Sequence, residues 1–185
     1  MKYWFISDWH FGHDRDFIWG KRGYSSVQEH DEDLISKFNS KVGTKDITYF
    51  LGDFCFNKEF DKYLSRLNGN FIILCGNHDK DFFRHLSSIS CKTKQKIIKF
   101  TTGFIDISLQ GKPITLCHFA MHSWNKSHFN AGHLYGHHHY ATDFGGKTLN
   151  VTVDGHNGYP YSEEEITSIL ESLPNNWDYI EKKRD

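Results

Sequence analysis

The feature of this sequence that most constrains the fold is a repeated arrangement in which a short apolar run leads directly into polar residues. In the clearest case, the apolar residues 71–74 are followed by Gly76, Asn77, His78 and Asp79. The arrangement recurs in residues 3–10, 47–53 and 114–118, and residues 136–139 supply two further imidazoles. Short apolar runs are typical of buried strands, and α/β folds build chemical sites at strand ends. The sequence therefore predicts a site assembled from several strand ends.

The first half of the chain alternates strand patterns with helix patterns. Strands are expected at residues 2–7, 47–51 and 71–74, separated by helices at residues 25–39 and 58–67. This β-α-β-α-β succession predicts a largely parallel sheet whose loops gather at the carboxyl edge of its strands.

The second half of the chain is richer in strand patterns. Residues 95–100, 104–109 and 113–117 are separated by turn residues, which predicts an antiparallel sheet. Shorter strands are expected at residues 134–135 and 149–153, and a short helix at residues 81–86. Ser162 and Glu165 have the spacing of a capping box, which predicts a final helix that continues through Leu170.

Three lysines alternate along the chain at Lys92, Lys94 and Lys96. An extended backbone would place all three on one face. Phosphate binding is one interpretation of this pattern. The favoured interpretation is an edge strand whose lysines oppose aggregation.

Length, charge and the absence of long apolar runs limit the class of protein that this chain can be. With 185 residues and 38% hydrophobic content, residues 1–185 are expected to form a single domain. A formal net charge of −1 gives no basic field for a long polyanion, so extended nucleic-acid binding is not expected. No leader pattern and no run of about 18 apolar residues occurs, so we expect a cytoplasmic protein without membrane contact.

The four cysteines, Cys55, Cys75, Cys91 and Cys117, lack the Cys-x-x-Cys spacing. Three of them lie in or beside apolar strand patterns. Buried free thiols in a reducing compartment are therefore expected, with a disulfide or a thiolate zinc site as the alternative.

Two pairs of polar residues have a spacing that suits metal ligands. Asp8 and His10 are two positions apart, as are His137 and His139, and extended backbone would turn each pair to one side. His138 would then face away from the site. Carboxylate, amide oxygen and imidazole groups without thiolate suit manganese, iron or zinc. Each cluster alone is weak, because a Gly-Asp pair is often a turn and a histidine tract can bind metal adventitiously.

The order of the clusters is more informative than any one of them. They form the series Asp-x-His, Gly-Asp, Gly-Asn-His-Asp, His and Gly-His-x-His, which resembles the calcineurin-like metallophosphoesterase family from residue 3 to about residue 166. The resemblance implies an α/β fold, a four-layer α-β-β-α sandwich with two mixed sheets. Residues 11–13, Asp154 and residues 160–162 resemble a small bacterial and phage branch of that family, whereas Gly23 and residues 119–121 depart from it.

The resemblance implies a site for two divalent metal ions, with manganese expected and iron, zinc or nickel as alternatives. Asp8, His10 and His139 would hold the first ion, Asn77, His118 and His137 would hold the second, and Asp53 would bridge the two.

The resemblance also implies roles for residues that do not bind metal. His78 would donate a proton to the leaving oxygen and would be held by Asp79, although positioning of the phosphate is an alternative role for His78. Arg22 and His13 would contact either the substrate or the metal-binding residues, with purely structural roles as the alternative.

The implied function is hydrolysis of a phosphodiester or phosphomonoester by direct attack of a hydroxide that bridges the two metals. A small phosphorylated substrate is expected as the partner. Two alternatives stay open from the sequence: a nuclease that acts on DNA or RNA ends, and a non-catalytic scaffold with the same fold. The sequence does not indicate the physiological substrate, the native metals or the oligomeric state.

Overall fold

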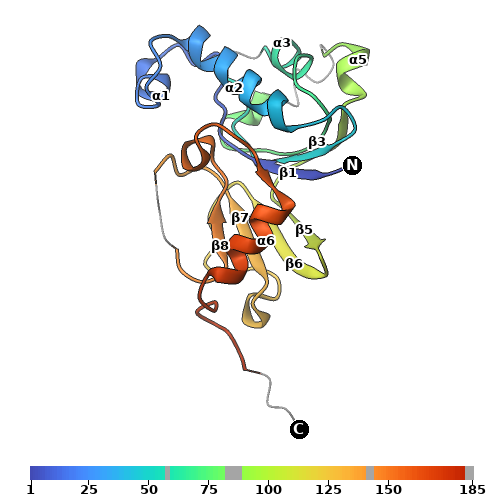
Figure 1. The fold of residues 1–185 in the computed structure, drawn as a ribbon, viewed down its shortest axis with the longest axis vertical. Helices are drawn as coiled ribbons and strands as arrows, with labels where there is room; N and C mark the ends of the chain where they lie inside the picture. The colour runs from blue at the N-terminus through green and yellow to red at the C-terminus, as the bar shows by residue number, and fades with distance from the viewer. Residues whose placement is uncertain (57–58, 82–88, 141–143, 182–185) are drawn as a thin grey trace.

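Two β-sheets, packed face to face, organise the chain (Figure 1). The computed structural model describes residues 1–56, 59–81, 89–140 and 144–181. The first sheet contains, in spatial order, β4 (Ile97–Thr101), β3 (Asn70–Leu74), β2 (Ile47–Phe50), β1 (Tyr3–Ile6) and β9 (Tyr161–Ser162). Strands β1 to β4 run parallel and β9 pairs antiparallel with β1, so the predicted parallel sheet is confirmed and extended by one antiparallel strand.

The second sheet contains, in spatial order, β5 (Phe104–Leu109), β6 (Lys112–Cys117), β7 (Gly132–Tyr135) and β8 (Thr148–Asn150). β5 and β6 form the predicted antiparallel hairpin, while β6, β7 and β8 run parallel to one another. Both sheets are therefore mixed, which confirms the predicted fold class.

Helices cover the side of the first sheet that faces away from the second (Figure 1). They are α1 (Asp16–Trp19), α2 (Val27–Lys41), α3 (Phe60–Leu64) and α5 (Cys91–Lys94), and α6 (Glu163–Ser172) lies beside the second sheet. The described residues also contain the short 3-10 helices η1 (Asp79–Asp81), η2 (Ser127–Phe129) and η3 (Val153–His156). Among the described residues, no helix combines the length and the apolar character that crossing a bilayer requires.

Helix starts follow the capping chemistry of the sequence. The Ser26 hydroxyl accepts a hydrogen bond from the Glu29 amide at the start of α2. At α6, the Ser162 hydroxyl accepts from the Glu165 amide, while the Glu165 carboxylate accepts from the Ser162 amide. The predicted capping box is confirmed, and such caps stabilise a helix by about 1 kcal/mol.

The alternation of side chains along each strand separates two apolar cores. On β1, Trp4 and Ile6 pack under the helices, whereas Phe5 points between the sheets. Leu116 of β6 and Leu134 of β7 meet Phe5 in this inner core. Because both faces of β1 are buried, its sequence is apolar throughout, as expected for a central parallel strand.

Two expectations for residues 81–100 were wrong, and a third falls outside the described residues. Lys92 and Lys94 lie on α5, a helix capped by Ser90, so they do not share a face of an extended strand. The strand that follows, β4, joins the parallel sheet next to β3 and not the antiparallel one. The expected helix at residues 81–86 lies almost entirely outside the described residues. The four cysteines are free as predicted, but only Cys55 and Cys117 are buried; Cys75 is partly buried and Cys91 is exposed.

The acid stability of the fold should depend on His133, which is fully buried on β7. Its Nδ1 donates to the Thr115 carbonyl at 3.0 Å, and its Nε2 accepts from the Met121 amide at 3.1 Å. Burial lowers the pKa of His133, so below about pH 6.5 the unfolded chain binds a proton that the folded chain does not. This contribution to stability is complete above pH 6.5 and is lost as the pH falls.

We therefore expect the free energy of unfolding to drop by about 1.4 kcal/mol per pH unit for this histidine, between its unfolded and folded pKa values. Urea titrations between pH 5 and 8, with chelator present, measure the slope. His133→Gln keeps a donor and an acceptor, and it should give a shallower slope than the wild type. The same change at exposed His122 is the control, and equal slopes for both variants would contradict the prediction.

Candidate metal centre

Polar residues from five strand ends converge at one edge of the two sheets. Asp8 follows β1, Asp53 follows β2, Asn77 follows β3, His118 follows β6 and His137 follows β7. Because β1, β2 and β3 are parallel, their carboxyl ends lie at the same edge, where α/β sheets carry their sites.

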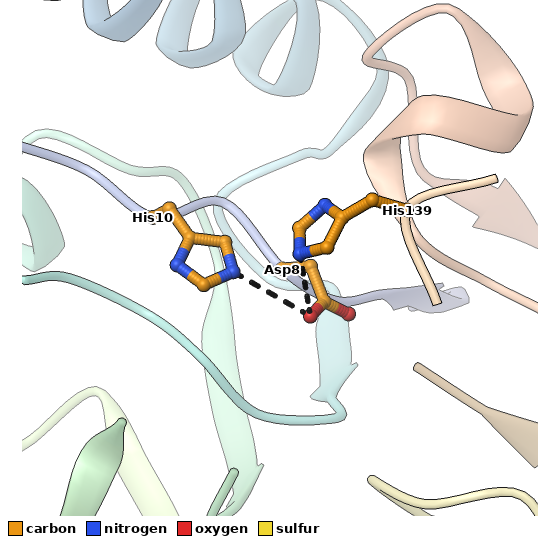
Figure 2. A group of neighbouring side chains, drawn as sticks. All are labelled: Asp8, His10 and His139. Atoms are coloured by element: carbon orange, nitrogen blue, oxygen red, sulfur yellow. Dashed lines mark ion pairs between the residues drawn. The ribbon is translucent and has the colours of Figure 1, made fainter. Parts of the chain in front are cut away.

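The first group of candidate ligands contains Asp8, His10 and His139 (Figure 2). The Nε2 atoms of His10 and His139 lie 3.7 and 3.8 Å from Asp8 Oδ1. Burial lowers the pKa of His10, which favours the neutral imidazole that can bind a metal. Burial alone would raise the pKa of Asp8, but the nearby imidazoles of His10 and His118 outweigh it and lower that pKa.

The second group contains Asp53, His118 and His137, and Asn77 adjoins it. His118 Nδ1 lies 2.7 Å from the Leu51 carbonyl, which can only accept, so in neutral His118 the proton is on Nδ1. The lone pair on Nε2 then faces Asn77 Oδ1 at 3.0 Å. Two facing acceptors repel each other, and a cation that binds both would relieve the repulsion.

Asp53 lies between the two groups. Its Oδ2 is 3.6 Å from His10 Nε2 in the first group and 3.6 Å from His118 Nε2 in the second. Its Oδ1 accepts a hydrogen bond from the His78 amide at 2.9 Å. One carboxylate therefore faces both groups at equal distance.

The backbone reaches this arrangement in a way that the sequence analysis did not predict. Asp8, His10, Asp53 and His137 have φ values of 61°, 52°, 60° and 70°, in the left-handed region that non-glycine residues seldom adopt. The expectation that extended backbone turns Asp8 and His10 to one side was therefore wrong, although their side chains do converge. His137 and His139 lie in different groups, although extended backbone would have turned both to one side. Such strain persists where packing holds it, and it is typical of functional sites.

Two glycines allow the strand ends to approach each other closely. A Cβ atom on Gly76 would lie 2.1 Å from Asp53 Oδ1, and one on Gly136 would lie 2.5 Å from Asp8 Oδ2. Any larger residue at either position would displace a carboxylate of the site.

Asp79 does not hold His78, so that part of the prediction was wrong. Its buried carboxylate accepts three main-chain hydrogen bonds, from Asp53, Phe54 and Gly76, at 2.6 to 2.9 Å. Burial raises the pKa of Asp79 to about 6, against the opposing effect of these three donors. Asp79 thus ties the loop after β3 to the loop that carries Asp53.

His78 and His13 line the cleft in front of the two groups. The His78 side chain is 43% exposed, and its Nε2 lies 4.0 Å from Asp53 Oδ2. The His13 ring contacts the rings of Phe17 and Phe56, and its Nδ1 accepts from the Arg15 amide. His78 therefore faces both the candidate metal site and solvent.

Arg22 lies behind the first group, where the sequence analysis suggested a contact with substrate or with metal-binding residues. Its side chain is 8% exposed, and it donates to both carboxylate oxygens of Asp154 and to the carbonyls of Asp8 and Trp9. Asp154 Oδ2 also accepts from His139 Nδ1 at 2.9 Å. With its proton on Nδ1, His139 presents the lone pair of Nε2 to the site.

Asp154 was noted in the sequence only as part of a resemblance, and its role was missed. Burial would raise the pKa of Asp154, but hydrogen bonds from His139 and Arg22 hold that pKa well below its usual range. Asp154 is 132 positions from Arg22, so no local spacing could have indicated the pair.

Asp154→Asn should weaken metal binding without removing any candidate ligand. The amide is neutral and no longer favours the His139 tautomer, so we expect the affinity for the ion held by Asp8, His10 and His139 to fall by about 10- to 100-fold. Calorimetric titration with Mn²⁺ measures this loss. Glu171→Gln removes an exposed carboxylate paired with Lys112 and is the matched control. Unchanged affinity in Asp154→Asn would contradict the prediction.

The residues fit a pair of metal ions on three grounds. Asp8 Oδ1 and His10 Nε2 are buried, and neither has a hydrogen-bond partner among the described residues. In each group the candidate ligand atoms lie within 4.8 Å of one another. The donors are carboxylate, imidazole and amide, a set that suits divalent ions of borderline softness. Buried polar atoms without partners are costly, and bound cations would satisfy them.

The fold and the site together define a phosphoesterase with two candidate metal sites. The sequence profile of the calcineurin-like phosphoesterase family matches residues 1–183, so the chain belongs to this family. It is therefore a metal-dependent phosphoric ester hydrolase.

Similar proteins align with most of the chain. An uncharacterised protein of Methanocaldococcus jannaschii is 30% identical over 181 residues, which cover 92% of each chain. A protein of unknown function from Aquifex aeolicus is similar in fold, with a TM-score of 0.66 and 23% identity over 91% of this chain and 98% of that one. A novel archaeal phosphodiesterase aligns with a TM-score of 0.49 and 19% identity over 84% of this chain and 87% of that one.

Proposed function

We propose that this protein hydrolyses small phosphodiesters or phosphomonoesters at a dinuclear metal site. The ligands would be Asp8, His10 and His139 for one ion, Asn77, His118 and His137 for the other, and Asp53 for both. The observation that carries this proposal is the position of Asp53 Oδ2, at 3.6 Å from a histidine of each group. A carboxylate that faces both groups equally can serve as the bridge that a two-metal site needs.

When bound, two divalent ions would supply a nucleophile at neutral pH and would stabilise negative charge on the phosphoryl oxygens. We propose Mn²⁺ as the metal, with iron, zinc or nickel as alternatives, because the donors include no thiolate. Asp154 and Arg22 keep His139 in the tautomer that presents Nε2 to the site. Asp79 holds the Asp53 loop against the loop after β3.

His78 is the candidate proton donor to the leaving oxygen. It lies at the solvent side of Asp53 and is the exposed imidazole nearest to that carboxylate among those described. A general acid of this kind typically contributes 10²- to 10⁴-fold. A small substrate is favoured because the cleft has a volume of about 590 Å³, the size that suits a drug-sized ligand. The net charge of −1 likewise offers no extended track for nucleic acid.

The test is a panel of three substrates with Mn²⁺: a small diester, a small monoester and a single-stranded oligonucleotide. We expect turnover of at least one small ester and little of the oligonucleotide. The matched control is the same protein after chelation, with activity restored by added metal. Preferential cleavage of the oligonucleotide ends would favour a nuclease. Bound metal without turnover of any substrate would favour a scaffold.

A further inference from the structure

The cleft in front of the metal centre contains a row of rings that hydrolysis itself does not require. Phe17 lies 4.9 Å from His13, His13 lies 4.3 Å from Phe56, and Phe56 lies 5.4 Å from His78, measured between ring centroids. Tyr140 and Lys21 line the same cleft. The row therefore starts at the exposed imidazole beside Asp53 and ends at Phe17, and the His13 ring within it lies 6.2 Å from the ring of the candidate ligand His10.

Phe17 and Phe56 of this row are exposed, and so is Tyr140, which lines the same cleft. The exposed fractions are 51% for Phe17, 46% for Phe56 and 69% for Tyr140. A single exposed aromatic residue needs no explanation, but several around one cavity mark a surface that takes a ligand. Apart from Ile18, the other lining residues of the cleft are polar, and they include His10, Asp53, His137 and His139. The cleft thus has a charged end for a phosphoryl group and an aromatic end for something planar.

We propose that Phe56, Phe17 and Tyr140 form a subsite for a planar ring of nucleobase size carried by the leaving alcohol of the phosphoester. The proposal rests on the proposed function, because it takes His78 to mark the side on which the leaving oxygen departs. Phe56 adjoins His78, so the ring of that alcohol would meet Phe56 first. Aromatic side chains stack on any base, since every base has a π-face. The substrate class is then a nucleoside phosphoester, or another ester with a ring on its alcohol.

The main test compares adenosine 5′-monophosphate with ribose 5-phosphate, and the methyl diesters of both, in the Mn²⁺-loaded enzyme. In each pair the leaving oxygen is the primary 5′ oxygen of a ribose, and the two leaving alcohols differ in the base. We expect kcat/KM to be higher for the base-bearing ester by about 5- to 150-fold, the range typical of one stacked base. Phe56→Ala should remove most of this ratio, chiefly through KM, and Phe56→Trp should retain it.

Phe129→Ala is the matched control, because Phe129 is an equally exposed phenylalanine that lines a different cavity. It should leave the ratio as in the wild type. A second pair, benzyl phosphate and cyclohexylmethyl phosphate, tests whether the subsite takes only a nucleobase or any planar ring. A preference in both pairs supports a subsite for any planar ring, and a preference in the adenosine pair alone supports a nucleobase subsite.

Binding without turnover gives an independent readout. In chelator, adenosine should bind more tightly than ribose to the metal-free chain, and Phe56→Ala should abolish the difference in an NMR titration. Hydrolysis of both esters at equal kcat/KM, with no change in Phe56→Ala, would overturn the subsite and leave the proposed function intact. Absence of hydrolysis of every ester by the metal-loaded chain would instead overturn the proposed function, and with it the assignment of the leaving side.

Discussion

Asp53→Asn is expected to reduce turnover on the order of 10³-fold at limiting metal and to weaken both metal sites together. The carboxylate of Asp53 faces His10 of one group and His118 of the other at the same distance of 3.6 Å. The amide has nearly the same shape but no charge, so neither ion would gain the attraction that a shared carboxylate provides. Loss of several kcal/mol of charge stabilisation corresponds to about tenfold in rate for each 1.4 kcal/mol.

Elemental analysis and calorimetric titration with Mn²⁺ measure the binding part of this prediction. The wild type should bind about two ions per chain, and Asp53→Asn should bind both more weakly. Asp33→Asn makes the same chemical change at a carboxylate paired with Lys37 on α2, and it should change neither stoichiometry nor rate. A wild type that binds a single ion at saturating Mn²⁺ would contradict the dinuclear proposal.

His78→Ala is expected to lower turnover by about 10²- to 10⁴-fold for esters with poor leaving groups while both metals stay bound. His78 is partly exposed and 4.0 Å from Asp53 Oδ2, a position that suits a proton donor better than a buried ligand. Removing a proton donor does not change the metal ligands, so the metal content should equal that of the wild type. The loss should shrink for a nitrophenyl ester, because its leaving oxygen is already a stable anion.

Comparison with a variant that lacks a metal ligand separates proton donation from metal binding. Asp8→Ala should depress both substrates alike and should be partly rescued by excess Mn²⁺, since it removes a candidate ligand. His122→Ala replaces an exposed histidine away from the cleft and is the control for the loss of an imidazole. Equal losses on both substrates in His78→Ala, with metals retained, would assign His78 to positioning of the phosphate. Loss of metal in His78→Ala would contradict the proton-donor role outright.

Local patterns predicted the secondary structure where one physical rule dominated. The apolar runs of β1, β2 and β3 indicated buried parallel strands, and Ser162 with Glu165 indicated the start of α6. The prediction failed at Lys92 and Lys94, where alternation suggested a strand. Ser90 caps a short helix there, and its hydroxyl also contacts Asp61 on α3, a contact that no local pattern can indicate.

The candidate site, too, was predictable from local patterns only in part. The residue types and their position after strands could be read from the sequence, because parallel strands bring their carboxyl ends to one edge. The hydrogen-bond partners that hold these residues in place could not be read. Asp79 was expected to hold His78, yet tertiary packing directs its carboxylate to the amides of Asp53, Phe54 and Gly76.

The sequence by itself determined which chemical groups reach the site and from which strands they come, since strand patterns and ligand types are local properties. Only the tertiary structure decided which residues support those groups. It joined Arg22 to Asp154 across 132 positions, and it aligned Phe17, His13 and Phe56 into one wall. The left-handed backbone at Asp8, His10 and Asp53 was likewise decided by the tertiary structure. These features depend on contacts between distant segments, whose combined packing overrides the local preference of each residue.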